Sequence, residues 1–368
     1  MYHNVKIWFR AAKVRKKLVR LVEIVYFCLL AKGNIYIFAN ENASVMKRIV
    51  VLGLFIVLLS RVAAQQQVPL RLLTWNLENL FDTEDDVGFA DEEFLPEGPR
   101  HWTKHRYWEK MTEVARVVAA VAEEGGLPSL IGLCEVENDS VLRALTKRSV
   151  MRHLGYDYVM THSEDARGID VALLYQPARF RLLEHHDIRV PSQAHGLHAT
   201  RDILYAKGLV LTSQGGVDTL HVMVVHLPSR TSGQQGDRNR RLAADVLWHT
   251  VDSIVGNRAG TAAEPRIVAM GDFNADSHDR IFKRAPLRLT DDSHAAGTYC
   301  FQGFWEWLDH ILVSSSVEPV SDARPLEYPW LLEGNKSYGG QMPRRTFRGT
   351  IYHGGISDHL PVLLDLQL

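Results

Sequence analysis

Short runs of apolar residues recur along residues 65–368, and polar or turn-forming residues bound each run. The runs are rich in Val, Ile, Leu and Tyr, a composition that favours β-strands. Their lengths of roughly five to eleven residues are also typical of strands. The predicted strands cover residues 70–76, 130–136, 156–161, 170–175, 180–190, 203–211, 219–225, 266–270, 308–313 and 362–366.

Three further segments have the apolar spacing of a helix. In residues 105–124, valines recur with the period of one helix face. Residues 139–148 follow Asn138, whose side chain suits a helix N-cap, and residues 237–255 repeat the helical spacing. Because strands outnumber helices and no repeat or Pro/Gly-rich linker divides this region, we expect one α/β domain of packed sheets and flanking helices.

Residues 46–64 have the pattern of a secretory signal peptide. Lys47 and Arg48 precede a short apolar run at residues 49–59, and small residues at 62–64 form a cleavage site. The apolar run is short for a membrane span, although a membrane anchor is the alternative. We therefore expect an exported protein, secreted or periplasmic, with no membrane span in the mature chain.

The signal pattern also implies that residues 1–45 are an upstream extension foreign to the native chain, and that residues 65–368 are the mature catalytic domain. Residues 1–64 hold eleven of the 42 Lys and Arg and two of the 43 Asp and Glu, which leaves residues 65–368 with a net charge of −10. An acidic protein does not bind nucleic acid through bulk charge. A phosphate substrate therefore requires a local basic patch or a metal ion.

Cysteine is sparse in the mature chain, which contains only Cys134 and Cys300. Two cysteines do not form a disulfide-rich scaffold. Cys134 lies in an apolar run, which favours a buried free thiol, and a single disulfide between the two is the alternative.

Polar side chains stand at one end of six of the predicted strands. A single such residue is ordinary, since each can cap a helix or form a turn. Six sets of amide, carboxylate and imidazole groups indicate instead a common face with chemistry. The residues are Asn76, Glu135, His226, Asp272 with Asn274, Asp309, and Asp358 with His359.

The residue types favour a hard metal ion. Carboxylate and amide oxygens suit Mg²⁺ or Mn²⁺, and the histidines do not have zinc spacing. The chain lacks the G-x-x-x-x-G-K-[ST] phosphate loop and the G-x-S-x-G serine elbow. One hard cation, two histidines and a carboxylate base suit the attack of water on a phosphoester.

Seven segments carry a family resemblance. In order, TWNLENL, LCEVEN, GIDVALLY, VVHLPSR, GDFNADS, LDHILVS and SDHLPV resemble the endonuclease/exonuclease/phosphatase superfamily, which has the deoxyribonuclease I-like fold. The resemblance covers residues 70–368. It implies a four-layer α/β sandwich, in which two packed mixed β-sheets are flanked by helices. It also implies a phosphoester hydrolase that depends on Mg²⁺, with Mn²⁺ or Ca²⁺ as alternatives.

The resemblance implies metal ligands among the strand-end residues. Glu135 matches the main ligand. Asn76 matches a residue beside it that supports the metal or a phosphate oxygen. Asp358 matches a residue near the ion, in direct contact or through water.

The resemblance also implies catalytic roles. Asp272 would orient or deprotonate the attacking water, and Asn274 would bond a phosphoryl oxygen. His359 would bind and protonate the phosphate, with Asp309 holding its tautomer. His226 would donate to a phosphate oxygen or to the leaving group.

Candidate substrate contacts are Arg201, Arg230 and Asp170, which lie near the motifs. Arg345, just before the last motif, is a further candidate phosphate contact. The alternative for the arginines is a place on a solvated face, and for Asp170 it is the start of a strand. Glu78 is a weaker site candidate, and its alternative is a solvated position in the loop after Asn76.

Three functions are compatible with these features. The first is a secreted nuclease, most simply an endonuclease acting on DNA or RNA. The second is a phosphoesterase acting on an inositol phosphate, a phospholipid head group or a sugar phosphate. The third is an inactive binding module, which the complete residue set disfavours. No stable protein partner is implied.

Overall fold

The computed structural model describes residues 69–230, 233–257 and 264–368. Within it, Val68–Leu368 forms a compact unit of its own. The upstream extension predicted at residues 1–45 and the signal peptide predicted at residues 46–64 lie outside the described residues. No helix in the described ranges is long and apolar enough to cross a membrane.

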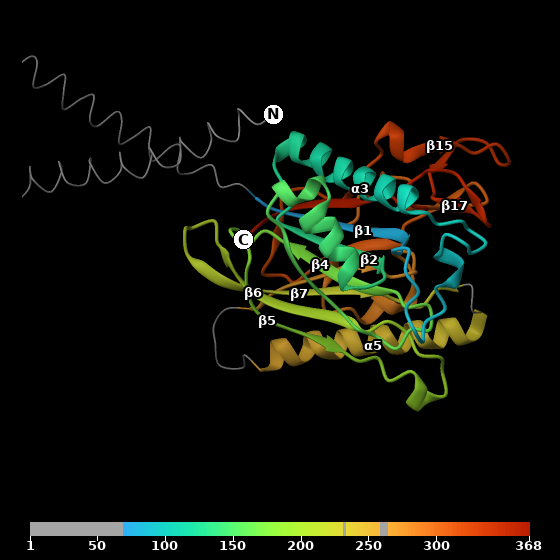
Figure 1. Ribbon diagram of the computed structural model, residues 1–368. Helices are drawn as coiled ribbons and strands as arrows, with labels where there is room; N and C mark the ends of the chain where they lie inside the picture. The colour runs from blue at the N-terminus through green and yellow to red at the C-terminus, as the bar shows by residue number, and fades with distance from the viewer. Residues whose placement is uncertain (1–68, 231–232, 258–263) are drawn as a thin grey trace, which may run out of the picture. The chain divides into compact units, whose positions relative to one another are not determined.

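The unit contains two mixed β-sheets (Figure 1). The first has the order β13-β19-β1-β2-β4-β3, with β14 also paired to β19; β1 and β2 are parallel, and β1 and β19 antiparallel. Its strands are β1 (Leu70–Leu80), β2 (Leu130–Val136), β3 (Asp157–Met160), β4 (Asp170–Tyr175), β13 (Glu318–Pro319), β14 (Arg324–Pro325) and β19 (Val362–Gln367).

The second sheet has the order β5-β6-β7-β8-β12-β9, in which only β7 and β8 are parallel neighbours. Its strands are β5 (Arg181–Ile188), β6 (Ile203–Leu211), β7 (Val217–His226), β8 (Arg266–Asp272), β9 (Arg288–Leu289) and β12 (Asp309–Val313). Three small antiparallel pairs complete the strands: β10 (Tyr299–Phe301) with β11 (Phe304–Glu306), β15 (Leu332–Gly334) with β16 (Gln341–Pro343), and β17 (Phe347–Arg348) with β18 (Ile351–Tyr352).

The three predicted helices are confirmed. They are α3 (Lys104–Gly125), α4 (Asp139–Arg143) and α5 (Gly233–Gly256). The Asn138 cap is also confirmed, since its side chain accepts a 3.0 Å hydrogen bond from Val141 N. The segment after α4 winds into a wider π-helical turn, Ala144–Arg148, because Ser149 N–H bonds the carbonyl of Ala144 five residues back. Short 3-10 turns cover Glu92–Phe94, Val150–His153, Gln193–His195, Arg280–Arg284 and Pro329–Leu331.

Three buried apolar clusters separate four layers. On β1, Leu72 faces the cluster between the two sheets, whereas Leu73 and Trp75 face the cluster beneath α3. On β7, Val224 faces the inter-sheet cluster and Met223 faces the cluster beneath α5. Successive side chains of a strand point to opposite faces, so each sheet is apolar on both sides. The predicted four-layer sandwich is therefore confirmed, with α3 and α5 on its outer faces (Figure 1).

All ten predicted strands are present, and several extend past their predicted ends. β7 continues to His226 and β8 to Asp272, so these two polar residues are the last paired residues of their strands, and β1 continues past Asn76 to Leu80 after a shift in its register. Pairing continues there because a polar side chain does not interrupt the backbone ladder. The two- and three-residue strands were not predicted, since they are too short to show periodicity.

Both cysteines of the described region are free, as predicted for Cys134. Cys134 is fully buried in the inter-sheet cluster, and its Sγ lies 3.2 Å from the carbonyl oxygen of Val225 on the other sheet. The alternative of a disulfide with Cys300 is therefore wrong.

Gly271 generates a stability prediction. Its φ is +140°, and a Cβ built there would lie 1.9 Å from the carbonyl oxygen of Val225. Gly271→Ala is therefore expected to lower the free energy of unfolding by at least about 2 kcal/mol, measured by urea denaturation. Gly334→Ala is the matched control, because no atom lies within 4 Å of its added Cβ. Equal stability of the two variants would contradict the prediction.

Candidate active site

The polar residues at the strand ends meet at one end of the two packed sheets. Strand register accounts for this, because Asp272 pairs with His226 on one side and with Asp309 on the other. In the first sheet, Asn76 pairs with Cys134, the neighbour of Glu135. The convergent residues line a cavity of about 840 Å³ and include Asn76, Glu135, His226, Asp272, Asn274, Asp358 and His359.

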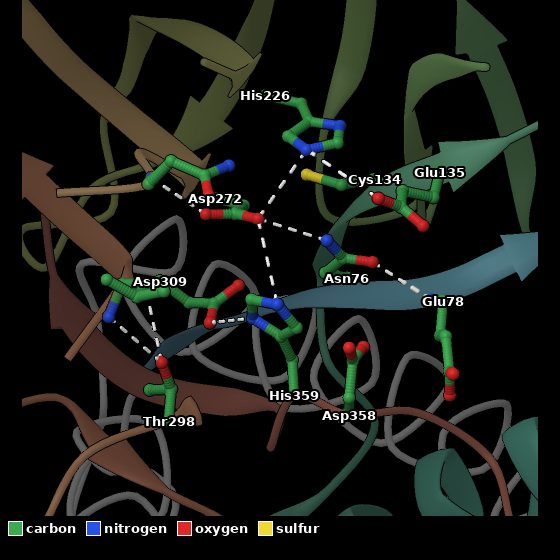
Figure 2. Close-up of polar contacts among 12 residues, drawn as sticks. Asn76, Glu78, Cys134, Glu135, His226, Asp272, Thr298, Asp309, Asp358 and His359 are labelled. Carbon is green, nitrogen blue, oxygen red and sulfur yellow. Dashed lines mark hydrogen bonds and ion pairs between the residues drawn. The ribbon is translucent and has the colours of Figure 1, made fainter. Parts of the chain in front are cut away.

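The carboxylate of Asp272 lies at the centre of this group and is 1% exposed. Asn76 Nδ2 donates to its Oδ2 at 3.0 Å, and Asn274 N donates to its Oδ1 at 2.8 Å. Figure 2 shows His226 and His359 approaching the same carboxylate from opposite sides, with Nε2 to Oδ2 distances of 3.5 and 3.9 Å. Burial, together with the charge of Asp309, raises the pKa of Asp272 to about 6.

His359 is held by a second buried carboxylate. Its Nδ1 lies 2.7 Å from Asp309 Oδ2, and the ring of Tyr299 lies 4.9 Å from the imidazole ring, centroid to centroid. Burial favours the neutral ring, but the negative charges of Asp309 and Asp272 outweigh it and raise the pKa of His359 well above its usual range. The ring is therefore a cation at neutral pH, and Asp309 directs its Nε2 toward the cavity.

His226 has the opposite electrostatic environment. Burial, and then the positive charges of Arg201, Arg167 and His359, lower its pKa well below the usual range. Its Nε2 lies 3.5 Å from Asp272 and 3.8 Å from Glu135. The site therefore contains one neutral and one charged imidazole on either side of a carboxylate, an arrangement suited to acid–base chemistry.

Oxygen ligands gather beside this group. Glu135 Oε2 accepts a 2.8 Å hydrogen bond from Asn79 N, and its Oε1 lies 3.8 Å from His226. Asn76 Oδ1 accepts from Glu78 N at 2.9 Å. Asp358 Oδ2 lies 2.9 Å from Arg345 Nη2. Carboxylate and amide oxygens thus face the cavity from β1, from β2 and from the loop before β19 (Figure 2).

The alternative that Glu78 is solvated is wrong. Its side chain is 6% exposed and accepts from Thr346 N at 2.6 Å and from Arg345 Nε at 3.2 Å. Beneath it, the buried Lys110 Nζ donates to the Glu78 carbonyl oxygen at 2.7 Å. The sequence did not reveal this burial, because the partners come from α3 and from a loop 267 to 268 residues later.

The backbone at the site is strained. Glu78, Asn79, Glu135 and Asn274 have φ between +48° and +61°. Residues other than Gly rarely adopt this left-handed conformation, which costs on the order of 1–3 kcal/mol at each position. Such strain clusters at functional sites, where the surrounding fold imposes it.

The donor set fits a hard divalent cation. The carboxylates of Glu78, Glu135 and Asp358 line one side of the cavity with Asn76, and Arg345 is shared by two of them. Burial and the charge of Asp358 raise the pKa of Glu78 to about 7, even though Lys110 and Arg345 lie nearby. The carboxylate and amide oxygens of this side are of the kind that Mg²⁺ or Mn²⁺ prefers.

A second group also brings potential ligand atoms together. Atoms of Asp272, Asp309 and His359 lie within 4.8 Å of one another. Here the positive charge is already supplied by the His359 ring, whose Nδ1 is hydrogen-bonded to Asp309. The chemistry of this group therefore favours proton transfer, and that of the Glu135 side favours metal binding.

The predicted substrate residues lie in different environments. Arg201 lines the cavity, but its guanidinium donates to the carbonyls of His226 and Leu227 and to Asp165, so it holds the cavity wall. Arg230 also lines the cavity and forms two hydrogen bonds with the carboxylate of Glu306.

The structure does not bring Asp170 to this cavity. Its carboxylate accepts from Thr161 Oγ1 at 2.7 Å and from Ser163 N at 3.0 Å, and it lines a second, smaller cavity. Arg167, three residues before Asp170, reaches the main cavity instead, where its half-exposed guanidinium lies 3.9 Å from Glu135. Sequence reasoning missed Arg167 and Tyr299, because each lies outside an apolar run.

Comparison with protein-family models gives a match to the endonuclease/exonuclease/phosphatase family over residues 72–368. The chain belongs to this family. The predicted resemblance is thereby confirmed over nearly the whole described region. Enzymes of this family are divalent-metal-dependent phosphoester hydrolases, and so is this protein. A search of curated proteins found no significant match.

Several solved structures share the fold. A D. rerio TDP2 humanized by 14 mutations aligns with a TM-score of 0.51 and 15% identity, over 82% of this chain and 100% of the other. The mannosyl-6-phosphatase of Bacteroides thetaiotaomicron aligns with a TM-score of 0.50 and 16% identity, over 81% and 100%. TDP2 from Caenorhabditis elegans aligns with a TM-score of 0.51 and 16% identity, over 81% and 74%. At these identities the likeness concerns the fold alone.

The His359–Asp309 pair generates a prediction for this family member. Asp309→Asn removes the main negative charge that raises the pKa of His359, so that pKa is expected to fall toward its usual range in the metal-free protein. An NMR pH titration of the imidazole protons measures it.

Hydrolysis by Asp309→Asn is expected to slow by about 10²–10⁴-fold, since the His359 ring loses its charge and orientation. Asp322→Asn, at an exposed position, is the charge-matched control. An unchanged His359 pKa in folded Asp309→Asn would contradict this account.

Proposed function

We propose that the protein is an exported, Mg²⁺- or Mn²⁺-dependent phosphodiesterase that hydrolyses DNA or RNA, with internal bonds as its main target. The observation that carries the proposal is the convergence of Asn76, Glu135, Asp272 and two differently charged histidines on one cavity. Such a set suits in-line attack of water on phosphorus. Export rests on the signal pattern at residues 46–64.

The oxygens of Glu135, Asn76 and Asp358 would hold the cation, with Glu78 and Arg345 fixing the position of Asp358. When bound, a divalent cation polarises a phosphoryl oxygen and neutralises charge that develops during attack. The positive φ of Glu135 turns its carboxylate out of the β2 ladder toward the cavity. The strained backbone conformation thus helps to place the Glu135 carboxylate as a metal ligand.

Asp272 serves as the base that orients and deprotonates the attacking water. Its pKa of about 6 leaves it ionised near neutral pH yet basic enough to accept a proton. Asn76 fixes one carboxylate oxygen by donating to Oδ2. Asn274 fixes the other through its backbone N–H and keeps one side-chain N–H for a phosphoryl oxygen, because the other donates to Leu227 O.

The two histidines donate hydrogen bonds to different atoms of the substrate. His359, charged and oriented by Asp309, donates from Nε2 to the phosphoryl group. His226, neutral and with Nε2 near Asp272 and Glu135, donates to a second phosphate oxygen or to the leaving group. Preorganised donors of this kind typically contribute a few kcal/mol each to transition-state stabilisation.

One wall of the cavity favours a substrate with a flat ring beside the phosphate. Tyr299 packs against His359, and Phe301 on the same hairpin lines the cavity while 56% exposed. Exposed aromatic rings stack on nucleobases whatever the sequence. We therefore expect single-stranded or frayed nucleic acid to be a better substrate than intact duplex.

A second candidate is a phosphoesterase for a small substrate such as a sugar phosphate. The ion pairs of the cavity arginines favour it. Arg201 is paired with Asp165, and Arg230 with Glu306. Arg345 is paired with both Glu78 and Asp358. A long polyanion would instead call for free basic groups along its path. Arg167 has only long contacts with two carboxylates, so its guanidinium is available to bind one phosphate.

A substrate panel tests the proposal. Residues 65–368 would be incubated with single-stranded DNA, RNA, supercoiled plasmid and small phosphoesters, with Mg²⁺, with Mn²⁺ and with EDTA. We expect metal-dependent cleavage of single strands, reduced by at least about 10²-fold in His359→Ala and in His226→Ala. Product lengths distinguish internal from terminal cleavage.

The outcomes of the panel are distinct. Cleavage of small phosphoesters alone would replace the nuclease with the second candidate. Wild-type rates in a folded His359→Ala variant would overturn the mechanism. No cleavage of any substrate by the folded protein would support an inactive binding module.

Metal binding gives a separate prediction. Glu135→Gln keeps the size of the side chain and its acceptor for Asn79 N but removes the charge, so Mg²⁺ affinity is expected to fall about tenfold or more. Isothermal titration of the EDTA-treated, dialysed protein measures it. Glu113→Gln, on the outer side of α3, is the control. Equal Mg²⁺ affinity in the two variants would remove Glu135 from the metal site.

A further inference from the structure

A second cavity of about 250 Å³ lies between the loop that follows β1 and the loop that precedes β4. Its polar lining comes from three parts of the chain. Asp86 and Asp91 belong to the first loop, Ser163 belongs to the second, and Asp170 is the first residue of β4. Glu137 and Asn138 complete the lining just beyond the end of β2.

The carboxylates of this cavity have no ion-pair partner among the described residues. Four carboxylates line it: Asp86, Asp91, Glu137 and Asp170. No Lys or Arg lines it, and across the described parts of the chain none of the four forms an ion pair. Asn138 Nδ2 donates to Asp86 at 2.9 Å, and Asp82 N donates to Glu137 at 2.6 Å, but these donors are neutral. Buried carboxylates are normally paired with a cation or bound to a metal.

Two buried oxygens in the cavity also lack a hydrogen-bond partner. Asp91 is 2% exposed, and while its Oδ2 accepts from Asp86 N at 2.9 Å, its Oδ1 has no partner. Ser163 is 8% exposed, and its Oγ has no partner. Leaving a buried oxygen unsatisfied costs about 1–3 kcal/mol. Both atoms belong to residues that line the cavity, so a ligand in it would satisfy them.

We propose that this cavity binds a Ca²⁺ ion that clamps the two loops together. All of the candidate ligand atoms of the lining except His162 are oxygens, as Ca²⁺ requires. Among the described residues, only Asp272, Asp309 and His359 bring three charged or imidazole ligand atoms within 4.8 Å. No three carboxylates of the second cavity come that close together, so at most two of them would bind one ion directly, and hydroxyl, amide and water oxygens would supply the rest of the six to eight ligands that Ca²⁺ takes. Mg²⁺ demands a tighter octahedron and fits this lining less well.

The clamp would act on the main cavity through Arg167. The two loops already touch, since Ala90 N donates to Ala166 O at 3.0 Å and Phe89 packs on Gly168. Arg167 lies between these contacts and reaches the main cavity, and the nearby Asp165 holds Arg201 there. Glu135 and Glu137 face the two cavities from one strand end, so the Ca²⁺ ion is distinct from the catalytic metal.

Calcium titration tests the proposal in residues 65–368, which contain the compact unit. The Glu135→Gln background weakens the catalytic metal site, so the second site can be counted separately. After EGTA treatment and dialysis, CaCl₂ binding is measured by isothermal titration, and the unfolding temperature by calorimetry. We expect one Ca²⁺ site in this background and a rise in the unfolding temperature with Ca²⁺.

Asp91→Asn in the same background is expected to weaken this site at least tenfold and to abolish the rise in unfolding temperature. Asn keeps an acceptor for Asp86 N, so the metal-free fold is preserved. Asp85→Asn is the matched control, since Asp85 lies in the same loop, is exposed and does not line the cavity. Ser163→Ala, expected to weaken binding severalfold, provides a second test if Asp91→Asn does not fold.

Two results would overturn the proposal. One is the absence of Ca²⁺ binding in the Glu135→Gln protein, which would mean that the cavity holds water alone. The other is equal Ca²⁺ affinity in the Asp91→Asn and Asp85→Asn proteins. If the background protein binds two Ca²⁺ ions, loss of one of them in Asp91→Asn still supports the second site.

Discussion

The buried carboxylate of Asp272 is the group on which the arrangement of the site depends. Removing a carboxylate from water costs several kcal/mol, and donors on several sides must offset that cost. Its partners come from β1, from β7 and from the loops that follow β8 and precede β19. They meet only when the two sheets pack at their observed distance and register. Sheet packing and site geometry are therefore one constraint, and a change in either disturbs the other.

The same constraint gives the two histidines different charges. Asp309 faces His359 directly, whereas positive groups surround His226. Both rings are buried, so burial alone would make both neutral. The difference arises from which carboxylate the strand register places beside each ring, because Asp309 is the direct β12 neighbour of Asp272. One charged and one neutral imidazole thus follow from the order of strands in a sheet.

Much of this fold could be predicted from sequence, because apolar runs of strand length report local structure directly. The polar residues at strand ends could be predicted for the same reason, as an apolar run that stops at Asn76 or Asp272 marks its own end. Glu78 could not, since its burial depends on Arg345 and Thr346 far along the chain. Arg201 was predicted to contact substrate, but its partners are backbone carbonyls, which leave no trace in the sequence. Asp170 begins a strand as the motif suggested, yet the strand faces a different cavity.

The thiol of Cys134 has a consequence for how this protein can be studied. It lies between the two sheets with no exposed surface, and burial raises its pKa well above the usual range. An alkylating reagent reacts with the thiolate and must reach it, so it can modify Cys134 only during moments when the sheets part. The rate of alkylation of Cys134 therefore measures how often the two sheets separate. Cys300 lies on the hairpin that carries Tyr299, so its alkylation rate reports separately on the opening of that cavity wall.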